Sequence, residues 1–387
     1  MTSNRNSRKI KDNIAKIIIY TATTLTILTL LVILGFVFRR GLPGINKDFL
    51  TRMWDDKTTI VTTEKNQKFL DKAEANYLPS LGLSLELEDG NVVVTGVERN
   101  SPAQKAVNKK GESYKIKESD IIERVGKTDL RKSESLDQVI AAIENEDTSI
   151  DLKIRRPGGG IIPMVISTVI IIIITLLVSL PIGVGAAIYL NEYAKPGKVL
   201  KIIRFAIQNL AGIPSIIYGL FGMLFFVQFL KMQYSVLAGA LTLSIMLLPT
   251  IISTTEETLK EVPYSYRQGS YGLGATKIQT ITRVILPSAL PGILVAIILS
   301  IGRIVGESAA LIWTAGTVAQ IPRALFGSGA AAATLTTKMF WEIQEASNID
   351  TAASIAVVLI VLVVVLNLVS KLITNRFLKK TGTAARN

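Results

Sequence analysis

The chain contains no cysteine and no histidine among its 387 residues. Without cysteine there is no disulfide, no thiol nucleophile and no thiolate metal site. Without histidine the Ser-His-Asp triad, the HExxH zinc site and imidazole base catalysis are excluded. The sequence also lacks a GxxxxGK[ST] loop and a GxGxxG loop for nucleotides. These absences argue against most enzyme classes, and we expect neither a metal nor a cofactor.

Charged residues are unevenly distributed along the chain. Residues 47–156 hold 19 Lys and Arg against 21 Asp and Glu, a formal charge of −2. The rest of the chain carries the whole positive excess, +15, within apolar sequence. Positive charge between apolar segments is typical of membrane topology rather than of phosphate-backbone binding. We therefore expect contact with membrane lipid and no nucleic-acid partner.

Long apolar runs account for the mean hydropathy of +0.41. A membrane-spanning helix needs about 20 mostly apolar residues. Six segments meet this requirement: 17–38, 161–190, 205–230, 235–255, 288–313 and 351–372. The first follows a basic tail and ends in Phe38-Arg39-Arg40 without a small-residue cleavage pattern. We interpret it as an uncleaved span rather than a signal peptide.

The placement of Lys and Arg between the spans predicts the topology. If the N-terminus is cytoplasmic, the cytoplasmic segments hold 18 Lys and Arg, and the short outside segments hold five. The opposite orientation would violate the positive-inside rule. We therefore expect a multi-pass protein with both termini in the cytoplasm and the stretch 56–157 outside.

Residues 56–157 interrupt the apolar pattern with a mixed-charge insert. GNVVVTGVER is rich in β-branched residues after an Asp-Gly turn, and SIDLKIRR alternates apolar and polar residues, as strands do. SESLDQVIAAIE places apolar residues at helical spacing after a serine cap candidate. The sequence predicts a small α+β domain at about 78–157, preceded by a linker or short helix over 56–76.

Three stretches of the insert resemble a PDZ domain of the bacterial HtrA kind. They are SLGLSLEL at 80–87, GNVVVTGVERNSPAQKA at 90–106 and IKESDIIERVGKTDL at 116–130. The resemblance implies that the backbone N–H groups of Leu81, Gly82 and Leu83 bind the C-terminal carboxylate of a peptide. Glycine suits such a loop because the backbone must approach the ligand closely. The alternative is a docking or spacer domain without a peptide ligand.

The segment 256–287 contains YRQGSYGLGATKIQTITRVILP. This run resembles the EAA loop of bacterial ABC importer permeases, where a glycine and a Leu-Pro end follow an E-A-A triplet at fixed spacing. Gly274, Leu286 and Pro287 match this pattern, whereas Gln268 stands in place of the glutamate. From the residues we expect a short helix over 256–271, then a glycine break, then a second helix that Pro287 ends.

Such a pair of short helices would form a knob at the membrane surface. The resemblance implies that Arg267, Gln268, Gly274, Leu286 and Pro287 couple the membrane helices to an ATPase. The alternative is an amphipathic loop that lies on lipid headgroups.

The resemblance extends across the spans. LPIGVGAAIYLNEYA at 180–194, NLAGIPSIIYGLFG at 209–222 and GRIVGESAALIWTAG at 302–316 resemble the PstA-like permeases of bacterial phosphate importers. This family implies an all-α, six-helix type I ABC importer permease. The chain would then comprise residues 1–55 with the first span, the PDZ-like α+β insert 56–157, and the five-helix core 158–387. The insert stands where the family ordinarily has a short loop.

Arg303 and Glu307 lie within the apolar fifth segment. One ionised residue at a bilayer centre costs roughly 2.5–3.5 kcal/mol, so such residues normally face a bundle interior or a water-filled path. At helical spacing they would share one face. A guanidinium offers paired donors to an oxyanion, so Arg303 is a candidate station on a substrate pathway, with Glu307 holding it when empty. The alternative is a structural ion pair.

The resemblance to PstA-like permeases implies a phosphate permease subunit of a bacterial cytoplasmic membrane. The resemblance implies three partners: a cytoplasmic ABC ATPase dimer, a homologous PstC-like permease and an extracytoplasmic phosphate-binding protein. The same chemistry would suit sulfate, molybdate or phosphonate. A membrane-tethered PDZ scaffold is a further alternative, but it needs neither the EAA spacing nor the intramembrane charges.

Overall fold

The computed structural model describes residues 3–66, 76–88, 90–109, 111–130, 135–145 and 148–380. The chain divides into two compact units. One unit is the insert, Asp48–Gly160, and the other combines Met1–Lys47 with Ile161–Asn387.

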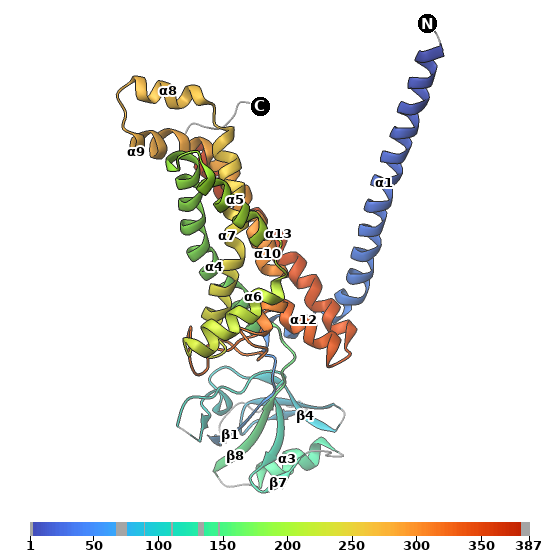
Figure 1. Ribbon diagram of the computed structural model, residues 1–387. Helices are drawn as coiled ribbons and strands as arrows, with labels where there is room; N and C mark the ends of the chain where they lie inside the picture. Colours follow the sequence, from blue (N-terminus) through green and yellow to red (C-terminus); the bar gives the residue numbers. More distant parts are fainter. Residues whose placement is uncertain are drawn as a thin grey trace. The chain divides into compact units, whose positions relative to one another are not determined.

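The second of these units is helical (Figure 1). Its helices are α1 (Ser3–Gly41), α4 (Ile162–Ile188), α5 (Lys198–Ala211), α6 (Ser215–Gly222), α7 (Val236–Glu261), α8 (Tyr264–Gly272), α9 (Lys277–Thr280), α10 (Leu286–Gly306), α11 (Ala309–Ile312), α12 (Leu335–Gln344) and α13 (Ile349–Lys380). Three π-helical segments extend them: η3 (Tyr189–Tyr193), η4 (Met223–Phe229) and η5 (Ile281–Ile285). A 3-10 turn, η1 (Leu42–Gly44), follows α1.

Among the described residues, five helical segments are long and apolar enough to cross a membrane, and a bent pair makes a sixth. The bent pair is α5 with α6–η4, whose axes turn by 96°. The turn falls at Gly212-Ile213-Pro214, because proline has no N–H and disfavours helical geometry in the residue before it. The expected third span, 205–230, is therefore broken rather than continuous.

The packing of α4 on α7 gives their relative direction. Thr175 of α4 donates a hydrogen bond to the carbonyl of Ala240 over 3.3 Å, near the start of α7. Further along both helices, Gly183 lies against Ile251. The two helices are thus parallel, and both begin at the same end of the bundle.

The bent pair joins the end of α4 to the start of α7, so it must return across the bundle. Arg204 of α5 forms an ion pair with Glu256, near the end of α7. Gly222 of α6 lies against Thr242, near the start of α7. The pair therefore covers the length of α7 and acts as one broken span.

Small residues hold the end of α1 against α13. A Cβ on Gly41 would collide with the carbonyl of Ala353, and a Cβ on Gly44 would collide with Ser354. Ser354 also donates to the carbonyl of Gly41 over 2.9 Å. Close backbone approach at small residues is the usual way in which membrane helices associate.

The described residues of the insert form one antiparallel sheet and a longer helix, α3 (Leu136–Glu144), whose first turn is capped by Ser135. The sheet contains β1 (Lys57–Glu64), β2 (Tyr77–Leu78), β3 (Leu83–Glu88), β4 (Asn91–Val97), β5 (Val107–Asn108), β6 (Ile121–Val125), β7 (Thr128–Asp129) and β8 (Ser149–Arg156). The strand order is β2-β3-β4-β6-β8-β1-β5, with β7 paired to β6. The short elements α2 (Lys47–Thr51) and η2 (Pro102–Gln104) complete the insert.

The structure corrects the expected linker over 56–76. Residues 57–64 form β1, which pairs with β8 along its whole length. Val61 of this strand is fully buried in the core of the insert. The β-branched run TTIVTT supports a strand, but the charged residues around it masked that signal. Residues 67–75 of the expected linker lie outside the described residues.

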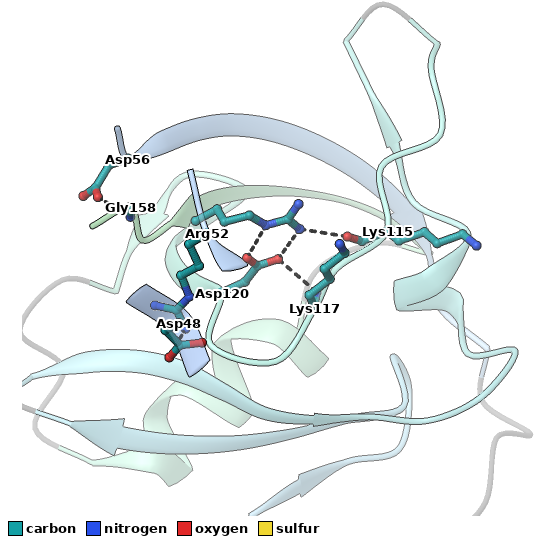
Figure 2. Close-up of polar contacts among 8 residues, drawn as sticks. Asp48, Arg52, Asp56, Lys115, Lys117, Asp120 and Gly158 are labelled. Atoms are coloured by element: carbon teal, nitrogen blue, oxygen red, sulfur yellow. Dashed lines mark hydrogen bonds and ion pairs between the residues drawn. The ribbon is translucent and has the colours of Figure 1, made fainter. Parts of the chain in front are cut away.

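The two ends of the insert are tied together next to β1 and β8. The Gly158 N–H donates to a carboxylate oxygen of Asp56 over 2.6 Å (Figure 2). The Gly159 N–H donates to the carbonyl of Trp54 over 2.7 Å. A Cβ on Gly158 or on Gly160 would collide with the opposite backbone. The PGGG run is therefore part of a close two-stranded stem.

Beside this stem, Asp120 forms a polar cluster (Figure 2). Its two carboxylate oxygens each accept a 2.7 Å hydrogen bond from the fork of Arg156, and one also accepts from the Lys117 N–H over 2.9 Å. The Arg156 guanidinium lies 4.7 Å from the ring centre of Tyr114. The cluster joins β8 to the loop before β6.

Candidate functional site

Arg303 lies in the last turn of α10, three residues before this helix ends at Gly306. One of its terminal nitrogens donates to the hydroxyl of Thr250 on α7 over 3.2 Å. No ion pair to Arg303 is found among the described residues. The guanidinium thus keeps most of its five donors for other acceptors.

Glu307 is the C-cap residue at which α10 ends. Its ψ of 122° is extended, so the expected continuous fifth span, 288–313, breaks at this residue. The Glu307 side chain instead accepts a 3.1 Å hydrogen bond from the Ala310 N–H at the start of α11. The expected contact between Glu307 and Arg303 is therefore absent in this conformation.

Several threonines lie around this break between α10 and α11. Thr336 of α12 donates to the carbonyl of Glu307 over 3.0 Å, and Thr168 of α4 accepts from the Leu335 N–H over 3.1 Å. Thr334 caps α12 in a capping box with Thr337. These hydroxyls satisfy backbone groups that a break within apolar surroundings would otherwise leave unpaired.

The same helix, α12, carries a buried charge pair. Lys338 and Glu342 lie 2.9 Å apart, with side chains only 9% and 6% exposed. Lys338 is one of the five Lys and Arg counted above in the short outside segments, and the sequence analysis did not single out Thr250, Thr336 or Glu342. The run Thr334-Leu335-Thr336-Thr337-Lys338 carried a helix-start signal, but nothing in the sequence indicated its contact with the break at Glu307.

The expected knob is present at the far end of α7, with different helix boundaries. Residues 256–261 belong to α7, and the first short helix is α8, which begins after Pro263. Gly274 has a φ of +81° between α8 and α9, a conformation that favours glycine. Thr276 and Gln279 then form a capping box at the start of α9. Figure 1 shows α8 and α9 together at this end of the helices.

Pro287 does not end the second helix, which corrects the sequence prediction. The chain runs from α9 through η5 into α10, so Leu286 and Pro287 open a long helix. A wider π-helical turn directly before a proline avoids the hydrogen bond that proline cannot donate. Ile281 and Ile285 of η5 are buried, whereas Ile278 of α9 is exposed.

Arg267 and Gln268, two of the residues predicted to couple the membrane helices to an ATPase, differ in solvent exposure. Gln268 is exposed on α8 and its side chain is available to a partner. Arg267 points into the bundle, where its fork donates to the carboxylate of Glu192 over 2.8 Å and to the carbonyls of Leu259 and Val262 over 3.0 and 2.8 Å. Arg267 thus packs against the ends of α4 and α7. Sequence reasoning did not identify Glu192.

The loop predicted to bind a peptide carboxylate is folded as a tight turn in the insert. The N–H groups of Leu81 and Gly82 both donate to the carbonyl of Leu78, over 3.4 and 2.9 Å. The neighbouring edge of β3 is paired with β2, and the Leu85 N–H donates to the carbonyl of Asn76 over 2.8 Å. The side chains of Leu81 and Leu83 are fully buried.

No group of three or more His, Cys, Asp or Glu side chains that could hold a metal ion occurs among the described residues.

Comparison with known families finds one match in this helical unit. Residues 179–382 match the model of the family described as binding-protein-dependent transport system inner membrane component. The match covers more than half of the chain. It begins inside α4 and includes the knob, Arg303 and α12.

Individual relatives match shorter stretches. A probable ABC transporter permease of Bacillus subtilis, YqgI, is 40% identical over 159 residues, which are 41% of this chain and 54% of that protein. A phosphate transport system permease protein PstA homolog of Mycoplasma pneumoniae is 36% identical over 204 residues, 51% of this chain and 31% of that protein. The PstA 1 protein of Mycobacterium tuberculosis is 36% identical over 159 residues, 41% of this chain and 51% of that protein. The chain thus spans about half the length, or less, of these curated relatives.

Among solved structures, the MetNI methionine ABC transporter matches with 20% identity and a TM-score of 0.43, over 55% of this chain and 91% of that one. A bacterial ABC transporter for alginate matches with 15% identity and a TM-score of 0.43, over 56% of this chain and 79% of that one.

Proposed function

Because the chain belongs to the family of binding-protein-dependent transport system inner membrane components, we propose that it is the permease subunit of an ATP-driven importer that moves inorganic phosphate into the cytoplasm. Membership of this family makes it an ABC transporter permease and not an enzyme. Phosphate as the substrate is supported by the relatives described as phosphate transport system permeases.

The substrate proposal rests on Arg303, whose guanidinium forms no ion pair among the described residues. It is a permanently charged group in the membrane-spanning unit, and the hydroxyl of Thr250 that it contacts is neutral. An arginine fork forms paired hydrogen bonds with phosphate oxygens, which a point charge does not reproduce. Glu307 lies close in sequence but is turned to the backbone of α11, so it does not neutralise Arg303.

The knob of α8 and α9 supports an ATPase partner. Its exposed surface includes the apolar side chains of Tyr264, Tyr266 and Leu273, the last of these 91% exposed. We place this knob in the cytoplasm, because that orientation puts most of the Lys and Arg of the connecting segments on the cytoplasmic side. In the complete importer the chain pairs with a homologous permease subunit and receives phosphate from an extracytoplasmic binding protein.

For the insert, the geometry supports a docking or spacer role over peptide capture. The Leu81 and Gly82 donors that a PDZ-like loop would offer to a carboxylate are bonded to Leu78, and β2 already covers part of the β3 edge. A peptide would have to displace residues 76–78, including the fully buried Leu78.

Uptake of labelled phosphate tests the proposal directly. The chain is assembled with its ATPase, its second permease subunit and its binding protein in proteoliposomes, and ATP is supplied on the cytoplasmic face. We expect ATP-dependent uptake of phosphate that excess sulfate, molybdate or phosphonate does not suppress. Preferred uptake of one of those anions would reassign the substrate, and no ATP-dependent uptake would favour the membrane-tethered scaffold.

A further inference from the structure

The two helices of the knob are both anchored to one residue at the end of α4. Glu192 lies in η3, and its carboxylate accepts hydrogen bonds from Arg267 of α8 and from the neighbouring Asn191, each over 2.8 Å. The backbone carbonyl of the same Glu192 accepts from Lys277 at the start of α9. The Lys277 ammonium also lies 4.5 Å from the ring centre of Tyr193.

This arrangement differs from a surface ion pair. The side chains of Glu192 and Arg267 are only 7% and 11% exposed, so both charges are largely removed from water. A buried charge is retained where its partners fix its position, and removing one partner leaves the other uncompensated. Arg267 also holds the carbonyls of Leu259 and Val262 at the end of α7.

The consequence is mechanical. The knob is covalently joined to α7 and α10, and Glu192 adds α4, which has no direct covalent link to it. Displacement of α8 or α9 by an ATPase is therefore transmitted to three spans. We propose that Glu192 is a positioning residue that makes α4 move with the knob during the transport cycle, and this inference rests on the proposed function.

Two substitutions test the role of Glu192. Glu192→Gln removes the charge and keeps the size, and Lys277→Met removes the contact with the Glu192 carbonyl. The matched control is Glu257→Gln, the same change at an exposed carboxylate near the end of α7. Uptake of phosphate and hydrolysis of ATP are measured on the same proteoliposomes, normalised to assembled complex.

For Glu192→Gln we expect phosphate moved per ATP to fall about 2- to 30-fold, the range of a coupling energy carried by a residue network. Assembly and ATP hydrolysis stay near wild type, because the ATPase still binds the exposed knob surface. Lys277→Met should show the same direction with a smaller loss, and Glu257→Gln no change. A merely structural role would lower the amount of assembled complex and leave phosphate per ATP unchanged, which overturns the proposal.

A second measurement does not depend on the substrate. Because the chain has no cysteine, spin labels can be placed at Ile182→Cys on α4 and at Ile278→Cys on α9 of the knob, both exposed positions. We expect one narrow distance distribution in the assembled wild-type complex and a broad one with Glu192→Gln. Equal distributions would refute the anchoring role even if the importer proves to move another anion, so this result and the failure of the phosphate proposal are distinguishable.

Discussion

Arg303 of α10 donates a hydrogen bond to Thr250 of α7 over 3.2 Å. This contact joins two helices close to the point where the fifth span breaks. It leaves the guanidinium without a carboxylate partner among the described residues, while Glu307 is occupied by the N–H of Ala310. Arg303 and Glu307 thus make separate contacts, one with α7 and the other with the start of α11.

Thr250→Val should therefore impair transport without disturbing assembly. The substitution keeps the shape of the side chain and removes the hydroxyl that orients Arg303. A hydrogen bond to a charged group is worth about 1.5–3 kcal/mol, so we expect a loss of phosphate uptake of about tenfold or more. Thr250→Ser, which keeps the hydroxyl, is the control. Equal uptake by the Val and Ser variants would mean that Thr250 does not position Arg303.

Gly274→Val should weaken the attachment of the ATPase. Gly274 has a φ of +81° and no atom within 4 Å of an added Cβ, so the obstacle is the backbone conformation alone. A left-handed conformation costs an L-residue roughly 1–2 kcal/mol, and a β-branched residue is an outlier there. Gly272→Ala, in open space at a helical position, is the matched control. ATPase co-purification at wild-type level with Gly274→Val would contradict the expectation.

The insert should fold alone as residues 48–160, whereas the shorter fragment 78–157 should not. The shorter fragment lacks β1, which pairs with β8 at eight positions and supplies the buried Val61. It would expose the edge of β8 and leave a cavity at Val61, a combination of lost transfer energy and lost packing. Thermal melts followed by circular dichroism compare the two fragments. Melts with the same midpoint would show that β1 contributes nothing to the stability of the insert.

The insert should also lose stability in acid through Asp56. The hydrogen bond from the Gly158 N–H, and secondly the contact with Arg155, lower the pKa of the Asp56 carboxyl below its usual value of 3.8. A group with a lowered pKa in the folded state stabilises that state above its unfolded pKa, and this contribution is lost as the pH falls through the folded pKa. We expect the melting temperature of fragment 48–160 to fall below about pH 4, and Asp56→Asn to reduce that dependence. An unchanged acid profile in Asp56→Asn would show that Asp56 has no such role.

Most of the membrane-spanning helices could be predicted from the sequence. The expected spans 161–190, 235–255 and 351–372 each correspond to one helical segment, because long apolar runs in lipid have few alternatives to a helix. The kink before Pro214 had a visible signal, but its angle depends on how α5 and α6 pack against α7. The packing of one helix against another cannot be predicted from the local sequence.

The partners of the charged side chains could not be predicted in the same way. Helical spacing predicted a contact between Arg303 and Glu307, but the helix ends between them and Glu307 caps the next helix instead. The resemblance implies that Arg267 couples the membrane helices to an ATPase, but it does not indicate the three acceptors that the Arg267 fork reaches inside the bundle. The acceptor of a buried arginine can lie far away in the sequence, as Glu192 lies 75 positions from Arg267. A single sequence does not show that two such distant residues are in contact.

The decisive test of Arg303 separates an anion station from a structural group. The double change Arg303→Met with Glu307→Gln removes both charges and keeps similar volumes, so it should be tolerated if neither charge takes part in transport, because buried charged groups can often be replaced together by uncharged ones of similar size. If Arg303 binds phosphate, the double variant assembles but loses uptake. Arg303→Lys should also be impaired, because an ammonium lacks the planar fork.

Glu307→Gln alone should do less harm than Arg303→Met alone. An amide oxygen at residue 307 still accepts from the Ala310 N–H, whereas Arg303→Met removes the fork that we propose binds phosphate. Phosphate uptake, normalised to assembled complex, is the measurement for all four variants. Wild-type uptake by the double variant would exclude Arg303 from the pathway, and the charge would then have to be explained by its hydrogen bond to Thr250 alone.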